Sequence, residues 1–176
     1  MSGTSTAAIT REALAQADGL YRLARRLTGS NADAEELVQE TFARALGARD
    51  PMRVGSNVRA WLYRILRNAH IDALRRRRAN PVSLSRDGED LDAASVDGEM
   101  LRDDRELDRL RGLVAEEIER ALATLSPDAR TIVLLDHEGL SEVELAEVLG
   151  CAIGTVKSRL SRARVALRAK LSEYAR

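Results

Sequence analysis

The sequence LSEVELAEVLGCAIGTVKSRLSRARVAL, residues 140–167, contains two helical patterns separated by a glycine. Ser141 and Glu144 have the spacing of a capping box, in which each side chain satisfies a backbone donor of the first helical turn. Gly150 directly follows the short helix expected at 142–149 and suits the left-handed conformation that ends many helices. A second helix starts at once, so the segment is predicted to be a helix-turn-helix.

The second helix of this segment is predicted to have an apolar side and a basic side. Residues 151–171 include six basic residues and no acid. At about 100° per residue, the apolar stripe consists of Ile153, Val156, Leu160, Ala163, Leu167 and Leu171. The opposite side consists of Ser158, Ser161, Arg162 and Val165, flanked by Lys157, Arg159, Arg164, Arg168 and Lys170. Short polar groups between cations suit a helix that reads base edges in a major groove while its flanks hold phosphates.

This charged face has two simpler interpretations. A basic face on a helix is most often only solvated, and amphipathic basic helices also bind membrane surfaces or partner proteins. The capped helix and the turn before it favour DNA, and residues 151–171 lack the bulky aromatic side chains expected of a membrane-surface helix.

The rest of the chain has helical patterns and no convincing strand, so the predicted fold class is all-α. Asn31 is expected to cap a helix that buries Leu37, Phe42, Ala45 and Leu46. Ser56 or Asn57 can cap a long helix that extends to about Arg78. Ser126 and Pro127 resemble an N-cap followed by proline at the first helical position.

Composition favours two small helical domains joined by a flexible acidic linker. The chain has 176 residues and 3% aromatic residues, which argues against one large core. Residues 81–98 are polar and acidic, a composition that cannot bury enough apolar surface to fold. The predicted division is therefore a helical domain at 1–80, a linker at 81–106 and the helix-turn-helix domain at 107–176.

Charge is distributed unevenly along a chain that is neutral overall. Residues 1–80 hold 14 arginines against 8 acids, a net charge of +6, and residues 113–155 hold 2 arginines against 9 acids, or −7. From Val156 onward there are 7 basic residues against one acid, or +6. Two basic ends separated by acidic material indicate two contacts with a polyanion, or with two partners.

The sequence gives little support for catalysis. His70 and His137 are isolated, with no second histidine or cysteine at metal-ligand spacing, and no nucleophile or phosphate-loop motif is present. Cys151 is the one cysteine and is expected to be a small buried thiol. We therefore expect a protein that is not an enzyme and holds no cofactor or metal. A chain without disulfides, signal peptide or membrane-spanning segment is expected in the cytoplasm.

Three segments, in this order, resemble the extracytoplasmic-function sigma factors of bacterial RNA polymerase, in the sigma-70 family. They are ADAEELVQETFARAL (32–46), NVRAWLYRILRNAHIDALRRRR (57–78) and LSPDARTIVLLDHEGLSEVELAEVLGCAIGTVKSRLSRARVAL (125–167). The resemblance covers nearly the whole chain apart from the first ten residues and the linker. It implies an alternative sigma factor that docks on core polymerase, recognises the −35 and −10 promoter elements and promotes DNA melting.

The resemblance also implies roles for individual residues. The resemblance implies that Glu36, Gln39 and Glu40 dock on the clamp coiled coil of the largest polymerase subunit. It implies that the loop from about 50 to 57, including Asn57, and Asn68 contact the −10 element. Trp61 is interpreted as a core residue rather than as a wedge that melts DNA. The residues implied to read the −35 element are Lys157, Ser158, Ser161 and Arg162. The residues implied to contact the DNA backbone are Thr155, Arg159, Arg164, Arg75, Arg76, Arg77 and Arg78.

The family further implies contact with the flap of the second largest polymerase subunit, promoter DNA and an anti-sigma factor as partners, with no membrane insertion. Two other interpretations remain. A simple regulator with a sensing domain would need a ligand pocket or βα repeat in residues 1–80, which the sequence lacks. A sigma-like decoy that sequesters an anti-sigma factor would not need the cations that are assigned to DNA contacts.

Overall fold

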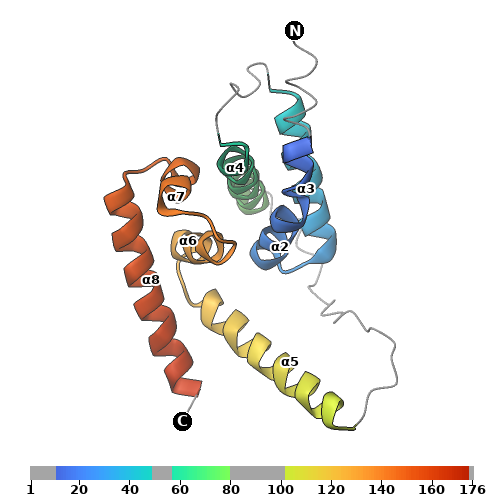
Figure 1. Ribbon diagram of the computed structural model, residues 1–176, viewed down its shortest axis with the longest axis vertical. Coiled ribbons are helices and arrows are strands. Elements are labelled where there is room, and N and C mark those ends of the chain that lie inside the picture. Colours follow the sequence, from blue (N-terminus) through green and yellow to red (C-terminus); the bar gives the residue numbers. More distant parts are fainter. Residues whose placement is uncertain (1–10, 49–56, 80–101, 175–176) are drawn as a thin grey trace. The chain divides into compact units, whose positions relative to one another are not determined.

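The computed structural model describes residues 11–48, 57–79 and 102–174, and within these ranges the chain forms helices and no strand (Figure 1). The all-α prediction is therefore confirmed. The helices are α2 (Ala17–Thr28), α3 (Asn31–Leu46), α4 (Val58–Ala79), α5 (Arg102–Ala123), α6 (Pro127–His137), α7 (Glu142–Leu149) and α8 (Ile153–Tyr174).

The helices divide into two compact units. The first unit contains residues 1–90 together with 134–153, and the second contains residues 91–133 together with 154–176. The chain therefore enters the first unit twice, and α7 belongs to it along with α2, α3 and α4. The predicted domain limits at 1–80, 81–106 and 107–176 stay a prediction.

The first unit is built on contacts between α2, α3 and α4, which lie side by side in Figure 1. Its core includes Leu20, Leu23, Ala24, Ala34, Leu37, Val58, Leu62, Tyr63, Leu66 and Ala69. The face that α3 buries differs from the expected one. Thr41 is fully buried and donates to the Leu37 carbonyl at 2.7 Å, whereas Leu46 is 77% exposed and Phe42 is half-buried. Short side chains at Ala34 and Thr41 allow α3 to approach its neighbours closely, because they occupy less space than Phe42 or Leu46.

Among the described residues, the helix caps expected from the sequence form as expected with one exception. The Asn57 Oδ1 accepts from the Ala60 amide at 3.0 Å, and the Ser126 Oγ accepts from the Ala129 amide at 3.3 Å, as expected. Ser30, rather than Asn31, caps α3 and accepts from the Asp33 amide. Asn31 is the first residue of that helix, and its side-chain oxygen instead accepts from the Arg25 Nε at 2.5 Å. The expected alternative cap Ser56 lies outside the described residues.

The second unit contains α5 and most of α8. Helix α5 begins at Arg102, inside the segment 81–106 expected to be linker, because no proline or glycine interrupts the helical pattern between residues 102 and 111. Residues 80–101 of that segment lie outside the described residues. The core of this unit includes Ala121, Leu122, Ile132, Val156, Leu160 and Ala163.

No helix in the described ranges is long and apolar enough to cross a membrane.

Close packing between α2 and α4 depends on a glycine. A Cβ atom placed on Gly19 would lie 2.3 Å from the Tyr63 hydroxyl, and Tyr63 is only 1% exposed. Gly19→Ala is therefore expected to destabilise the first unit by about 1 to 3 kcal/mol, the usual cost of overpacking a core. The measurement is urea unfolding followed by the fluorescence of Trp61, the one tryptophan, which lies on α4 of the first unit, and by circular dichroism, which reports on the helices of both units.

Gly112→Ala is the matched control for that substitution. Gly112 lies in the helix α5, and a Cβ there would meet nothing within 4 Å. Exchange of an exposed helical glycine for alanine stabilises a helix by up to about 1 kcal/mol. Stabilisation by Gly19→Ala of the same size as by Gly112→Ala would contradict the packing.

Candidate nucleic-acid interface

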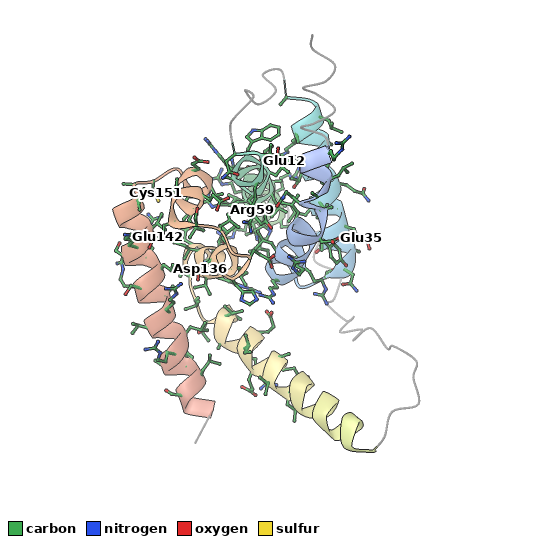
Figure 2. The ribbon with its side chains drawn as sticks, in the orientation of Figure 1. Glu12, Glu35, Arg59, Asp136, Glu142 and Cys151 are labelled. Atoms are coloured by element: carbon green, nitrogen blue, oxygen red, sulfur yellow. The ribbon has the colours of Figure 1, made fainter. Side chains whose placement is uncertain are left out.

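The turn between α7 and α8 has the backbone of a helix-turn-helix. The Ser141 Oγ accepts from the Glu144 amide and the Glu144 carboxylate accepts from the Ser141 amide at 2.7 Å, which confirms the capping box. Gly150 adopts φ 63° and ψ 40° in the left-handed region and ends α7. Cys151 follows in the turn (Figure 2) and is half-buried rather than buried, because a side chain in this short connection is only partly covered.

The basic side of α8 is exposed as the periodicity predicted, apart from Lys170, which is half-buried. The exposed residues are Lys157, Ser158, Arg159, Ser161, Arg162, Arg164, Val165 and Arg168, with Thr155 half-buried. Val156, Leu160 and Ala163 of the opposite stripe are buried, and Leu167 and Leu171 are half-buried. Ile153 departs from the expectation, because it is 41% exposed at the start of the helix, where the stripe has no covering layer.

Two of the expected base-reading side chains are bonded to their own helix. Ser158 donates to the Thr155 carbonyl at 3.0 Å, and the Arg162 Nε donates to the Ser158 carbonyl at 3.2 Å. These bonds restrict the rotamers of the side chains without covering them. A partner that offers better acceptors, such as base edges, can take over the remaining donors of the Arg162 guanidinium.

A pocket of about 440 Å³ lies beside α8 in the second unit. Arg159, Arg162, Ala163 and Ala166 line one side of it, and residues 124–126 with Asp128 and Ala129 line the other. The structure therefore brings Arg159 and Arg162 to one hollow, although the sequence had separated them as a flanking and a central cation.

The residues expected at the −10 element lie on α4. Asn57 is exposed at the start of the helix and Asn68 is exposed in its third turn. Arg75, Arg76, Arg77 and Arg78 are all exposed at its end. Arg77 is engaged within the unit, since its Nη2 lies 2.7 Å from the Asp33 Oδ2. Residues 50–56 of the expected loop lie outside the described residues, and Trp61 is half-buried.

The three residues expected to dock on polymerase lie along α3. Glu36 and Gln39 are exposed and Glu40 is half-buried. Glu36 and Glu40 line a groove of about 330 Å³ that runs between α3 and α4, with His70, Arg76 and Arg77 on the α4 side. The groove therefore combines acidic and basic walls in one unit.

The sequence did not predict the ion pair between Arg44 and Glu40, which holds the Glu40 side chain in place. The Arg44 Nε lies 2.7 Å from the Glu40 carboxylate, and the Arg44 Nη1 lies 3.0 Å from the Asp72 carboxylate on α4. Hydrogen bonds to Asp72 and then Glu40 raise the pKa of the Arg44 guanidinium. The Glu40–Arg44 spacing of four residues was a readable helix signal, whereas nothing local indicated Asp72.

A second missed set of contacts surrounds Glu138, in the turn before α7. The Arg22 Nη2 of α2 lies 2.9 Å from the Glu138 Oε2, and the guanidinium of Arg59, marked on α4 in Figure 2, donates to the Glu138 carbonyl at 2.5 Å and to the Gly139 carbonyl at 3.2 Å. Arg59 also lies 5.8 Å from the centre of the Tyr63 ring. Burial, followed by the Glu138 charge, raises the pKa of the Tyr63 phenol. The opposite net charges of residues 1–80 and 113–155 were the one sequence signal for these contacts.

Glu144 connects the capping box to α4. Its Oε1 accepts from the Asn57 Nδ2 at 2.9 Å, while its Oε2 accepts from the Ser141 amide and hydroxyl. Burial acts to raise the pKa of Glu144, but the hydrogen bonds from Asn57 and Ser141 together outweigh burial and leave the pKa below its ordinary value. The charged carboxylate is thus favoured in the folded chain.

Family comparisons agree with this architecture. The family described as Sigma-70 region 2 matches residues 15–80, and Sigma-70, region 4 matches residues 115–167. The chain is 38% identical over 160 residues to the ECF RNA polymerase sigma factor SigE of Mycolicibacterium smegmatis, covering 90% of this chain and 59% of that protein. It is 40% identical to SigL of Mycobacterium tuberculosis, covering 88% and 83%, and 36% identical to EcfG of Rhodopseudomonas palustris, covering 94% and 86%.

Solved structures give the same result. The sigma factor RpoE in complex with the anti-sigma factor NepR from Bartonella quintana matches with a TM-score of 0.70 and 33% identity, covering 93% of this chain and 96% of that chain. CnrH in complex with the cytosolic domain of CnrY matches with a TM-score of 0.65 and 27% identity, covering 96% and 90%. The chain belongs to the ECF RNA polymerase sigma factors of the sigma-70 family.

The bonds of Glu144 predict how its titration responds to mutation. Because its folded pKa is depressed, the stability that Glu144 contributes is present above its unfolded pKa and is lost as the pH falls through the folded pKa. Asn57→Asp keeps an oxygen to cap α4 but replaces the amide donor with a negative charge, so it is expected to raise the Glu144 pKa. Titration of the Glu144 carboxyl by NMR in both proteins measures this shift. An equal Glu144 pKa in the two proteins would contradict the Asn57 contact.

Proposed function

We propose that this chain acts as an alternative sigma factor that docks on core RNA polymerase, binds the −35 and −10 promoter elements and promotes DNA melting. Family membership supports the class, and the exposed basic side of α8 behind a capped helix and a left-handed glycine carries the DNA-binding assignment. Its action is regulatory rather than catalytic. Because polymerase and promoter DNA are its partners, the chain works in the cytoplasm.

Reading of the −35 element is assigned to Lys157, Ser158, Ser161 and Arg162, which are all exposed on one helix. Arginine can bind the two acceptors of guanine, and serine hydroxyls can donate to or accept from either base of a pair. Thr155, Arg159 and Arg164 are assigned to the DNA backbone, where they position the helix without reading sequence.

The −10 element is assigned to Asn57 and Asn68, because an asparagine amide carries both a donor and an acceptor for an unpaired base. The Asn57 amide would have to exchange its bonds to Ala60 and Glu144 for that contact. Arg75 to Arg78 lie beyond them at the end of α4, where exposed guanidinium groups can hold phosphates of the separated strands, Arg77 in exchange for its bond to Asp33. Asn68 lies on the surface about two turns before these arginines, so one helix offers both kinds of contact.

Docking on the polymerase clamp is assigned to Glu36, Gln39 and Glu40. Two acids and an amide along α3, of which Glu36 and Gln39 are exposed and Glu40 is half-buried, suit charge-assisted bonds to arginines of a partner helix. The flap of the second largest subunit is the further contact that the family implies.

Regulation by an anti-sigma factor is proposed because one similar solved structure contains the anti-sigma factor NepR, and another is a complex of CnrH with the cytosolic domain of CnrY. The same observation favours the second candidate function, a decoy that only sequesters an anti-sigma factor. The exposed cations of α8 and of the end of α4 favour a true sigma factor, since a decoy has no use for them.

Run-off transcription with core polymerase, with and without the purified chain, tests the proposal. Promoter-specific transcripts that require the chain are expected. A chain that binds an anti-sigma factor but never supports transcription would instead be a decoy.

Core docking is expected to fail in the double variant Gln39→Ala with Glu40→Arg, because it removes the exposed Gln39 amide and reverses the charge at the half-buried Glu40. Loss of charge-assisted bonds predicts at least about tenfold weaker competition for core polymerase. Glu147→Arg, a charge reversal at an exposed acid of α7, is the control. Unchanged competition by the double variant, with its helix content retained, would remove the docking assignment.

The two classes of DNA contact on α8 are expected to fail differently. Arg162→Ala should cost about 1 to 3 kcal/mol at the −35 element and relax preference at one or two base positions. Arg164→Ala should weaken binding to all sequences alike and lower the salt slope by about one unit, since one phosphate neutralisation is lost. Transcription from promoters with each −35 base varied, at two salt concentrations, separates these results. A uniform loss with Arg162→Ala would contradict groove reading by this helix.

A further inference from the structure

One acid in the groove between α3 and α4 belongs to none of the proposed contact sets. Asp33 lies in the first turn of α3 and lines the groove of about 330 Å³ together with Glu36 and Glu40. Arg76 and Arg77 line the groove on the α4 side. The groove is therefore bordered by proposed docking residues and by proposed phosphate-binding residues, and Asp33 is assigned to neither set.

Asp33 forms a short ion pair with Arg77 near the end of α4. The Arg77 Nη2 donates to the Asp33 Oδ2 at 2.7 Å, between residues that are 44 positions apart in sequence. The Asp33 side chain is 25% exposed, whereas that of Arg77 is 56% exposed. The carboxylate is thus largely covered, while more than half of the arginine side chain remains accessible to a partner.

The Asp33 carboxylate is held in place by its own helix. Ser30 caps α3 and accepts from the Asp33 amide at 3.3 Å, which fixes the backbone at this position. A negative charge in the first turn is also stabilised by the dipole of the helix. Asp33 therefore offers a charged oxygen to Arg77 at a defined place in the groove.

Carboxylate and phosphate oxygens compete for the same donors of an arginine. Both accept charge-assisted bonds, and the strongest arrangement uses two parallel N–H groups of the planar guanidinium. Nη2 carries one hydrogen of each of the two parallel pairs that a guanidinium can offer. The bond to Asp33 therefore occupies one of these pairs at Arg77, and the adjacent negative charge repels a phosphate that approaches the other pair.

The neighbouring arginines of α4 provide a comparison within the same helix. Arg75, Arg76 and Arg78 are exposed, as Arg77 is. Within residues 11–48, 57–79 and 102–174, the structure pairs only Arg77 of these four with an acid. Asp33 therefore acts on one selected member of the basic cluster rather than on the cluster as a whole.

We propose that Asp33 is an internal competitor for nucleic-acid phosphate at Arg77, and that it lowers the affinity of the end of α4 for single-stranded DNA. Without DNA its carboxylate occupies the place of a phosphate oxygen, and a phosphodiester of a bound strand displaces it. This inference rests on the proposed contacts of Arg75 to Arg78 with phosphates. The exchange at Arg77 can nevertheless be measured on the chain without polymerase.

Binding of a labelled single-stranded oligothymidylate to the full-length chain tests the exchange. The assay is done at low ionic strength, where contacts with phosphates are strongest. Asp33→Asn keeps the shape of the side chain but removes the competing charge, so it is expected to strengthen binding about two- to fivefold, the range that exposed ion pairs set. Arg77→Gln is expected to weaken binding. Unfolding would lower affinity, so the expected gain with Asp33→Asn cannot result from it.

Glu35→Gln is the matched control. Glu35 is an exposed acid of the same helix (Figure 2) that does not line the groove, and its substitution changes the net charge by the same amount as Asp33→Asn. In an Arg77→Gln background, Asp33→Asn should strengthen binding no more than Glu35→Gln does. An equal gain with Asp33→Asn and Glu35→Gln, an undiminished gain in the Arg77→Gln background, or no loss with Arg77→Gln alone would overturn the competition.

NMR of the unsubstituted chain gives a second measurement of the same exchange. As the oligonucleotide is added, the carbon-13 signal of the Asp33 carboxyl group is expected to move toward its position in the Arg77→Gln variant, because the phosphate takes the arginine away. A carboxyl signal that stays in place when the chain is saturated with oligonucleotide would reject the exchange.

Run-off transcription by the same variants distinguishes this inference from the proposed function. Absence of transcription, together with the expected binding and NMR results, would reject the sigma activity and keep the competition at Arg77. Normal transcription, with equal oligonucleotide binding by Asp33→Asn and Glu35→Gln, would reject the competition and keep the sigma activity.

Discussion

The backbone groups at helix ends are the constraint on which the rest of this structure depends. Each helix leaves donors at its start and acceptors at its end without partners inside the helix. In a chain with 3% aromatic residues the cores are small, so side-chain caps contribute strongly to where four of the helices begin. Ser30, Asn57, Ser126 and Ser141 each accept from an amide three residues later and thereby set the starts of α3, α4, α6 and α7.

Placement of the functional side chains follows from these starts. With α4 beginning at Val58, Asn68 and Arg75 to Arg78 lie on its exposed side while Leu62, Leu66 and Ala69 are buried. Gly150 ends α7 in the left-handed conformation, and α8 then begins at Ile153. With this start of α8, Val156, Leu160 and Ala163 are buried. Ser158, Ser161 and Arg162 are exposed on the opposite side of the helix.

Two of the capping residues have a second partner. Asn57 and Glu144 each satisfy a helix start and also bond to each other at 2.9 Å. The same two side chains therefore stabilise the starts of their helices and join segments that are distant in sequence. Loss of the bond between Asn57 and Glu144 would therefore affect the starts of both α4 and α7 without rearranging either helix along its length.

The sequence by itself determined the all-α class, the capping box, the glycine turn and the exposed basic side of α8, because each depends on residues within a few positions of one another. It placed Asn57 at a helix start for the same reason. Only the tertiary structure decided that Thr41 rather than Leu46 is buried, that Arg44 joins Glu40 to Asp72, and that Arg59 binds the turn at Glu138. These depend on neighbours 28 to 79 residues away in sequence or on the fit between helices, and no periodic pattern within one helix specifies which residues of another it will meet.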